Sequence, residues 1–304
     1  MNLKNISCLA LIACLLTQTV YALDVEPRRW NHTPIDMNFF GLAYVSTDAD
    51  IKVDPVLELE DVEMDLDIWV ARYTHSFESF GKSSRIDITQ TYQDGQWDGL
   101  LQGEPAQTSR HGLGDTFVRY AISLYGAPPL KADEYVAYRR SQDIETIVGA
   151  GVVIRLPTGD YHKDRLINLG QNRFVVRPQL GVQHNRGPWS FDFSSEVAFY
   201  ETNDEFYDGN QLRQDPLFIF LSTVTYNFKP GLWASVGVAY DYGGETELNG
   251  VDKDNPKQNE AWGATIAYPL SRQAGVSLSY IETRTQESTG LDSESFAAGI
   301  AFSF

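Results

Sequence analysis

The sequence of 304 residues has little cysteine, little positive charge and almost no long apolar runs. Its two cysteines, Cys8 and Cys14, lie near the N-terminus, so the rest of the chain can form no disulfide or thiolate metal site. The 24 basic residues are outnumbered by 41 acidic ones, and the formal net charge of -17 has the wrong sign for holding a phosphate backbone. Beyond the N-terminus no apolar run approaches the roughly 20 residues of a spanning helix. These absences exclude a helical transporter, and we expect no nucleic-acid partner.

The N-terminus has the pattern of an export signal. Lys4 supplies a positive charge, residues 6–16 are apolar, and Val20-Tyr21-Ala22 resembles a signal-peptidase site. We therefore expect residues 1–22 to be a cleaved signal peptide, which would leave a mature chain without cysteine. A motif that ends at Cys14 resembles a lipoprotein box, and lipidation of Cys14 is the alternative.

Most of the remaining chain alternates between apolar and polar residues at strand period. In residues 174–184, for example, Phe174, Val176 and Leu180 alternate with Arg177 and Gln179. The same pattern recurs often enough to predict about twelve strands of membrane-spanning length. They are expected near 37–47, 64–76, 84–93, 114–125, 145–156, 172–185, 189–200, 215–228, 232–242, 260–269, 275–284 and 293–304.

The connections between these segments alternate in length. Those at 185–189, 228–232 and 269–275 are short, whereas those at 47–64, 93–114, 156–172, 200–215 and 242–260 are long. Short inner turns and long outer loops are typical of outer-membrane barrels. The connection at 126–143 breaks the pattern, and its Pro128-Pro129 followed by residues 132–135 could begin a short periplasmic helix. We predict an all-β fold, a transmembrane antiparallel up-and-down β-barrel of about twelve strands over residues 37–304; a soluble sandwich is the alternative.

Several motifs carry a family resemblance. They include Pro27-Arg28-Arg29-Trp30-Asn31, Tyr125-Gly126-Ala127-Pro128-Pro129-Leu130, Pro157-Thr158-Gly159-Asp160-Tyr161 and Gln214-Asp215-Pro216-Leu217. Over nearly the whole mature chain the sequence resembles the outer-membrane family labelled putative MetA-pathway of phenol degradation. The resemblance implies a barrel of the transport class, but it assigns a role to no residue and identifies no solute. Similar chains often end in Trp, whereas this one ends in Phe304, which can also serve as the aromatic assembly signal.

Charged residues of both signs fall on the polar phase of the predicted strands, which faces the lumen. The candidates for lumen or solute contact are Arg119, Arg155, Arg173, Arg177, Asp87, Asp192 and Glu196. Arginine forks could grip the carboxylate of a solute such as an aromatic acid. Alternatively, the charges pair with one another and close the lumen. Residues 23–36 form either a periplasmic tail or a plug; a plug built on Arg28, Arg29, Trp30 and Asn31 is favoured because Trp30 needs burial.

Carboxylates crowd three of the predicted outer loops. The loops hold Asp48, Asp50, Asp54, Glu58, Glu60, Asp61 and Glu63; Glu201, Asp204, Glu205 and Asp208; and Glu245, Glu247, Asp252 and Asp254. Such clusters could bind divalent cations or bridge through them to lipopolysaccharide phosphates. Their spacing matches no EF-hand, so solvated charge is the favoured interpretation.

We expect a channel of the bacterial outer membrane through which small aromatic or otherwise hydrophobic compounds pass passively, without a cofactor or metal. The expected partners are outer-membrane lipid, lipopolysaccharide, the barrel-assembly machinery and a small organic solute. A structural or surface-interaction barrel without transport is the alternative. A phospholipase-like hydrolase that uses His184 and Ser222 is less favoured, because a third orienting group and a G-x-S-x-G motif are missing.

Overall fold

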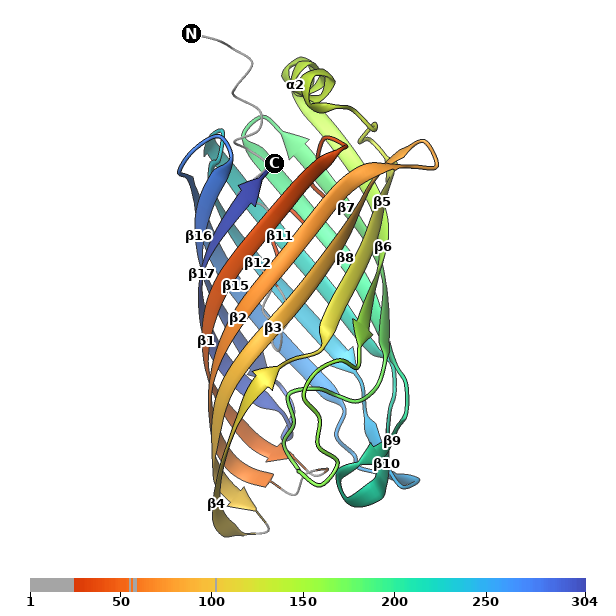
Figure 1. The fold of residues 1–304 in the computed structure, drawn as a ribbon, viewed down its shortest axis with the longest axis vertical. Helices are drawn as coiled ribbons and strands as arrows, with labels where there is room; N and C mark the ends of the chain where they lie inside the picture. The colour runs from red at the N-terminus through yellow and green to blue at the C-terminus, as the bar shows by residue number, and fades with distance from the viewer. Residues whose placement is uncertain (1–24, 55, 57–58, 102) are drawn as a thin grey trace.

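The computed structural model describes residues 25–304 except 55, 57, 58 and 102. The expected signal peptide, with Cys14, and the predicted loop residue Glu58 lie outside the described residues. In the described chain, twelve antiparallel strands form a closed barrel (Figure 1), which confirms the predicted fold. The strands are β1 (Met37–Asp54), β2 (Leu59–Ser79), β3 (Lys82–Leu101), β5 (Thr116–Tyr125), β6 (Ile144–Leu156), β7 (Val175–Arg186), β8 (Trp189–Tyr200), β11 (Leu217–Lys229), β12 (Leu232–Gly243), β15 (Lys257–Pro269), β16 (Ala274–Thr285) and β17 (Leu291–Ser303).

Closure is made by the first and last strands. β1 pairs with β17 along one edge and with β2 along the other, and β2 pairs with β3. At the C-terminus, the Phe304 amide donates to the Asn38 carbonyl at 2.9 Å, and the Asn38 amide donates to the Phe304 carbonyl at 3.0 Å. Phe304 therefore ends the seam, with 65% of its surface exposed.

The long inner connection contains the helix that its sequence suggests. Helix α2 (Ala132–Ser141) follows the two prolines and lies at the same end of the barrel as the C-terminus (Figure 1). Asp133 and Glu134 occupy its first turn and Arg139 and Arg140 its last, an order that complements the helix dipole. Among the described residues, no helix has both the length and the apolar character to cross a membrane.

Two of the predicted outer loops are in fact strands. β1, β2 and β3 continue well beyond their predicted ends, and β4 (Glu104–Leu113) pairs with β3 at the outer end. In the described sheet β4 has no strand partner on its other edge. The physical reason is that apolar and polar residues still alternate beyond the membrane, but the apolar residues now face the lumen instead of lipid. Val62, Met64 and Leu66 face inward, whereas Glu63 and Asp65 are exposed.

This extension changes the setting of the first acidic cluster. Asp48 and Asp50 lie on β1 and Asp61 and Glu63 on β2, and all four side chains are exposed; Asp54 and Glu60 also fall within strand bounds. In register, Asp48 lies opposite Asp65. The second and third clusters flank or belong to a small outer sheet. It consists of β9 (Asn203–Phe206), β10 (Asn210–Gln214), β13 (Thr246–Leu248) and β14 (Val251–Asp252), with the 3-10 turn η2 (Tyr207–Gly209).

The outward face of the barrel's middle part is apolar. Exposed large side chains such as Leu180, Phe193, Val236 and Leu278 cover it. On β2 the last apolar side chain of this face, toward the outer end of the barrel, is that of Trp69. The next side chain on the same face is that of Asp67, which is charged. An apolar band bordered by aromatic residues is the surface that a bilayer requires of a barrel.

Candidate functional site

The N-terminal segment, residues 25–36, lies inside the barrel. Its deepest-set side chains include Glu26, Arg29 and Trp30, which are 1%, 4% and 5% exposed. The Trp30 ring packs against Gly149 and Gly181, which are register partners on β6 and β7. A methyl group on Gly181 would lie 1.8 Å from the indole nitrogen, so these glycines form a slot for the ring. The indole N–H also donates to the Ser194 hydroxyl at 2.7 Å.

A second slot receives Val25. Gly237 on β12 and Gly263 on β15 are register partners, and Val25 packs against both. Val25 also belongs to an apolar cluster with the inward-facing Ala239 and Ala261. The segment is thus fitted to the lumen wall by side-chain shape at two points on different strand pairs.

At the inner end the segment is held by helix α2 and its loop. The Tyr135 hydroxyl donates to the His32 carbonyl at 3.0 Å, and one ring nitrogen of His32 lies 2.9 Å from the Pro128 carbonyl. The other ring nitrogen lies 3.3 Å from Glu145, which also pairs with Arg139. The long inner connection therefore holds the N-terminal segment by these contacts at the inner end of the lumen.

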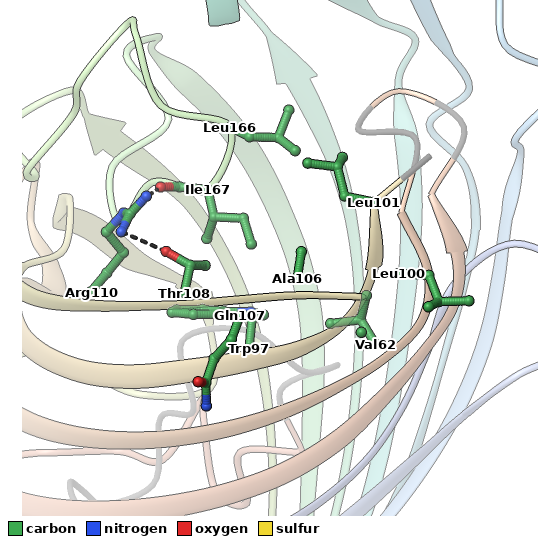
Figure 2. A pocket seen from close by; sticks show the side chains of 11 residues that line it. Val62, Trp97, Leu100, Leu101, Ala106, Gln107, Thr108, Arg110, Leu166 and Ile167 are labelled. Atoms are coloured by element: carbon green, nitrogen blue, oxygen red, sulfur yellow. Dashed lines mark hydrogen bonds between the residues drawn. The ribbon is translucent and has the colours of Figure 1, made fainter. Parts of the chain in front are cut away.

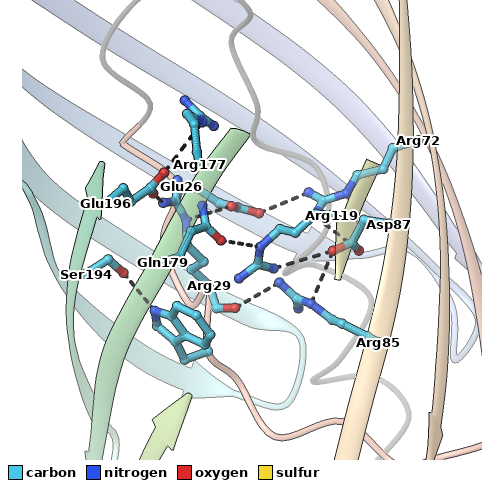
Figure 3. A network of polar contacts seen from close by, with 11 residues as sticks. Glu26, Arg29, Arg72, Arg85, Asp87, Arg119, Arg177, Gln179, Ser194 and Glu196 are labelled. Atoms are coloured by element: carbon cyan, nitrogen blue, oxygen red, sulfur yellow. Dashed lines mark hydrogen bonds and ion pairs between the residues drawn. The ribbon is translucent and has the colours of Figure 1, made fainter. Parts of the chain in front are cut away.

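A network of charges crosses the lumen beside the segment (Figure 3). Asp87 on β3 is its wall-side carboxylate: Arg72 lies 3.3 Å from it, and Arg85 and Arg119 each lie 3.4 Å from it. The Thr74 hydroxyl donates to the same carboxylate at 2.6 Å. Asp87 is 2% exposed, so each charge is compensated by a partner rather than by bulk water.

The segment supplies the central part of this network. Glu26 accepts from Arg29 and from Arg72, each at 3.0 Å. Arg29 also pairs with Glu196 on β8, and Arg177 lies 3.7 Å from that carboxylate. These contacts join β2 to β8 across the bore through two residues of the segment (Figure 3).

The other predicted lumen arginines also have protein partners. Arg119 donates from Nε to Gln179 at 2.8 Å, and its guanidinium lies 5.0 Å from the Trp30 ring. Arg155 donates to Asp115 at 2.7 Å. Arg173 precedes β7 instead of lying on it, because Asn172 has a positive φ of 53° and turns the chain before the strand begins. Its guanidinium stacks on Tyr200 at 4.7 Å and donates to Gln214.

Two predicted residues are buried without a counter-ion in contact among residues 25–304 as described. Asp192 is 4% exposed, and no side chain of the described residues donates a hydrogen bond to its carboxylate. Arg28 is 6% exposed and lies 5.5 Å from the Trp233 ring. Asn31 is half-buried, and its backbone N–H donates to the Arg28 carbonyl at 3.1 Å in the turn of the segment.

Beyond the charged network, the inner wall that β1 to β3 form at the outer end is largely apolar. A buried cluster contains Val45, Val62, Leu66, Ile68 and Trp97, together with Leu169 from the loop 157–174. Next to it a cavity of about 200 Å³ lies between β2 to β4 and this loop (Figure 2). It is lined by Val62, Trp97, Gly99, Leu100, Leu101, Ala106, Gln107, Thr108, Arg110, Leu166 and Ile167.

The loop that covers this cavity is fixed at Asp115. That carboxylate accepts from the amides of Gly159 and Gln171, each at 2.9 Å, in addition to Arg155. Asp115 is 1% exposed. The loop therefore closes the wall between β4 and β6 with its own set of hydrogen bonds.

Sequence reasoning missed Glu26, Arg72, Arg85, Trp97 and Arg110. Arg72 and Arg85 share the inward parity of Arg119 and Asp87, so their phase could have found them. Glu26 gave no such signal, because it lies before the first strand. His184, in contrast, contacts the Thr146 hydroxyl at 2.9 Å rather than a serine nucleophile. No three His, Cys, Asp or Glu side chains of the described residues are grouped to hold a metal ion.

Residues 51–302 match the family described as Putative MetA-pathway of phenol degradation. The chain belongs to this family. The COG4313 outer membrane channel from Pseudomonas putida F1 has a similar fold: it superposes with a TM-score of 0.78 at 18% identity, over 92% of this chain and all of that one. The transport unit of the autotransporter AIDA-I from Escherichia coli gives a TM-score of 0.52 at 9% identity, over 95% of each chain. No curated protein sequence matches. The family member described here therefore has the fold of an outer-membrane channel.

Proposed function

We propose that this barrel lets small aromatic or otherwise hydrophobic compounds cross the outer membrane passively. The observation that carries the proposal is the apolar inner wall that β1 to β3 form at the outer end, where Leu66, Ile68 and Trp97 face inward. Porin lumens are polar because they conduct water and hydrophilic solutes. An apolar wall instead offers an apolar solute a favourable transfer from water. The solute's own gradient then drives the passage, and no catalytic chemistry is involved.

The N-terminal segment sets the condition for passage. Glu26 and Trp30 fill the lumen next to the charged network, and both are almost fully buried. We infer that solute passes the inner half of the barrel when residues 25–36 move aside. The contacts that hold them are hydrogen bonds, ion pairs and two packing slots, all of which can re-form.

Export and assembly follow from the chain ends in this proposal. Residues 1–22 direct the chain across the inner membrane and are removed. The barrel-assembly machinery then recognises β17 together with Phe304, which follows it, and the apolar outer face contacts outer-membrane lipid and lipopolysaccharide.

Uptake of an apolar dye by intact cells tests the function. N-phenyl-1-naphthylamine fluoresces when it enters the cell envelope, and a lipopolysaccharide leaflet keeps it out. Cells with the wild-type barrel should take it up faster than cells without it. Leu166→Asp places a charge in the cavity and should abolish most of this gain.

The matched control is His162→Asp, which adds the same charge to the same loop outside the cavity and should transport like wild type. Heat-modifiable migration in gels confirms that each variant is folded. A folded wild-type barrel that leaves dye uptake unchanged would contradict the proposal and favour a surface-interaction role.

A further inference from the structure

The cavity beneath the loop 157–174 is mostly apolar; Gln107, Thr108 and Arg110 are its polar lining residues, and Arg110 lies toward one end (Figure 2). The side chains of Val62, Trp97, Leu166 and Ile167 form much of its apolar lining. Its volume of about 200 Å³ exceeds the roughly 150 Å³ in which an engineered protein cavity holds benzene. A six-membered ring that carries one small polar group therefore fits.

The Arg110 guanidinium is fixed in place by neutral acceptors. Its Nε donates to the Ile167 carbonyl at 3.0 Å, and its Nη1 donates to the Thr108 hydroxyl and the Ser109 carbonyl, each at 2.7 Å. In the described part of the chain no carboxylate pairs with Arg110, and its Nη2 donates no hydrogen bond. The positive charge is therefore oriented by its neighbours but not neutralised by them.

This sets Arg110 apart from Arg72, Arg119 and Arg155, which pair with carboxylates deeper in the barrel. Arg72 and Arg119 share Asp87, and Arg155 pairs with Asp115. At the outer end, burial lowers the pKa of Arg110, and the nearby Arg165 lowers it further. Asp164 counteracts this effect by raising the pKa. An anion at Arg110 would supply the compensation that Arg72, Arg119 and Arg155 already have.

We propose that this cavity binds small aromatic carboxylates, with the carboxylate accepting from Arg110 and the ring lying against Trp97, Leu166 and Ile167. Charge-assisted hydrogen bonds suit a carboxylate in particular, and the two N–H groups of Arg110 Nη2 can donate them. The inference rests on the proposed function, because it assigns a solute class to the apolar site at the outer end. It differs from the sequence-based expectation, because Arg110 rather than the predicted lumen arginines would bind the carboxylate of the solute.

Calorimetric titration of the purified, folded barrel with benzoate and with its neutral isostere benzamide at pH 7 tests the proposal. Benzoate should bind the wild type about tenfold more tightly or better, since the ring is shared and the charge differs. Arg110→Gln should reduce benzoate affinity to that of benzamide and leave benzamide unchanged. Arg110→Lys keeps the charge but loses the hydrogen bonds that fix the position of the guanidinium, and should give an intermediate value.

Two controls define the site. Arg213→Gln removes an exposed outer arginine that lies outside the cavity and should change neither affinity. Ala106→Trp fills the cavity and should abolish binding of both compounds. These variants separate loss of the anion contact from loss of the cavity.

Equal affinities of benzoate and benzamide for the wild type would overturn the proposal, as would an unchanged benzoate preference in Arg110→Gln. Absence of benzoate binding while the barrel still speeds dye uptake would refute the carboxylate site and leave the proposed function standing. If dye uptake also fails in the folded wild type, the proposed function fails with it.

Discussion

Replacing Gly181 by alanine should release the N-terminal segment from the lumen. The new methyl group would lie 1.8 Å from the indole nitrogen of Trp30, and the ring also contacts Gly149 on the neighbouring strand, so it must leave its slot. Burial of a tryptophan removes about 150–250 Å² from water, which corresponds to about 4–6 kcal/mol as an upper value. The hydrogen bond to Ser194 adds about 1 kcal/mol. The exposed population of the segment should rise at least about a hundredfold, since each 1.4 kcal/mol is a factor of ten.

Limited trypsin digestion measures this release directly. Trypsin cleaves after Arg28 and Arg29, which are 6% and 4% exposed in the barrel, so the wild type should resist cleavage there. Cleavage tracks the open population when opening and closing are fast. Val182→Ala, the adjacent position facing lipid, is the matched control and should stay resistant.

A second variant tests the cause. In the Trp30→Ala background, Gly181→Ala should have no further effect, because the ring it displaces is gone. Wild-type resistance at Arg28 and Arg29 in a folded Gly181→Ala barrel would refute the reasoning that Trp30 anchors the segment.

Three further changes act on separate parts of the barrel. Asp87→Ala leaves three buried guanidinium groups short of a carboxylate and should lower the free energy of unfolding by about 3–5 kcal/mol in urea titrations, whereas the exposed Asp65→Asn should change it by less than about 1 kcal/mol. Asp115→Ala removes the acceptor of two amides and one guanidinium, so protease nicking within 157–174 should appear at concentrations that leave wild type intact. Phe304→Ala should slow the appearance of folded barrel in cells, followed by pulse-chase and heat-modifiable migration, and an unchanged rate would exclude Phe304 as an assembly signal.

The sequence predicts the barrel well because period-two alternation and turn lengths are local properties. It fails at residues 47–64 and 93–114, where strands replace the predicted loops. Within the membrane the apolar phase faces lipid, but beyond Trp69 it faces the lumen, and the acidic outward phase resembles a solvated loop. Val62, Met64 and Leu66 alternate with polar residues as in any strand, but these apolar side chains face the lumen and not the lipid.

The site was less accessible to sequence reasoning. Strand parity marks Asp87 and Arg119 as inward-facing, and the structure brings them to 3.4 Å from each other. It cannot show that Glu26 reaches Arg72, since that contact joins a segment without strand pattern to a residue 46 positions away. Arg110 was hidden for a related reason: its cavity exists only because a distant loop folds over β4.

The central claim is that apolar solutes cross this barrel when the N-terminal segment moves aside. A reversible lock tests it most directly. A Cβ atom on Gly263 would lie 3.3 Å from that of Val25, close to the roughly 3.5–4.5 Å of a disulfide, and residues 25–304 contain no native cysteine. Cells carrying Val25→Cys with Gly263→Cys should take up N-phenyl-1-naphthylamine slowly when the disulfide is formed and at the wild-type rate after reduction. Uptake by each single variant should not change when the reductant is added. Uptake at the wild-type rate with the disulfide fully formed would contradict the account.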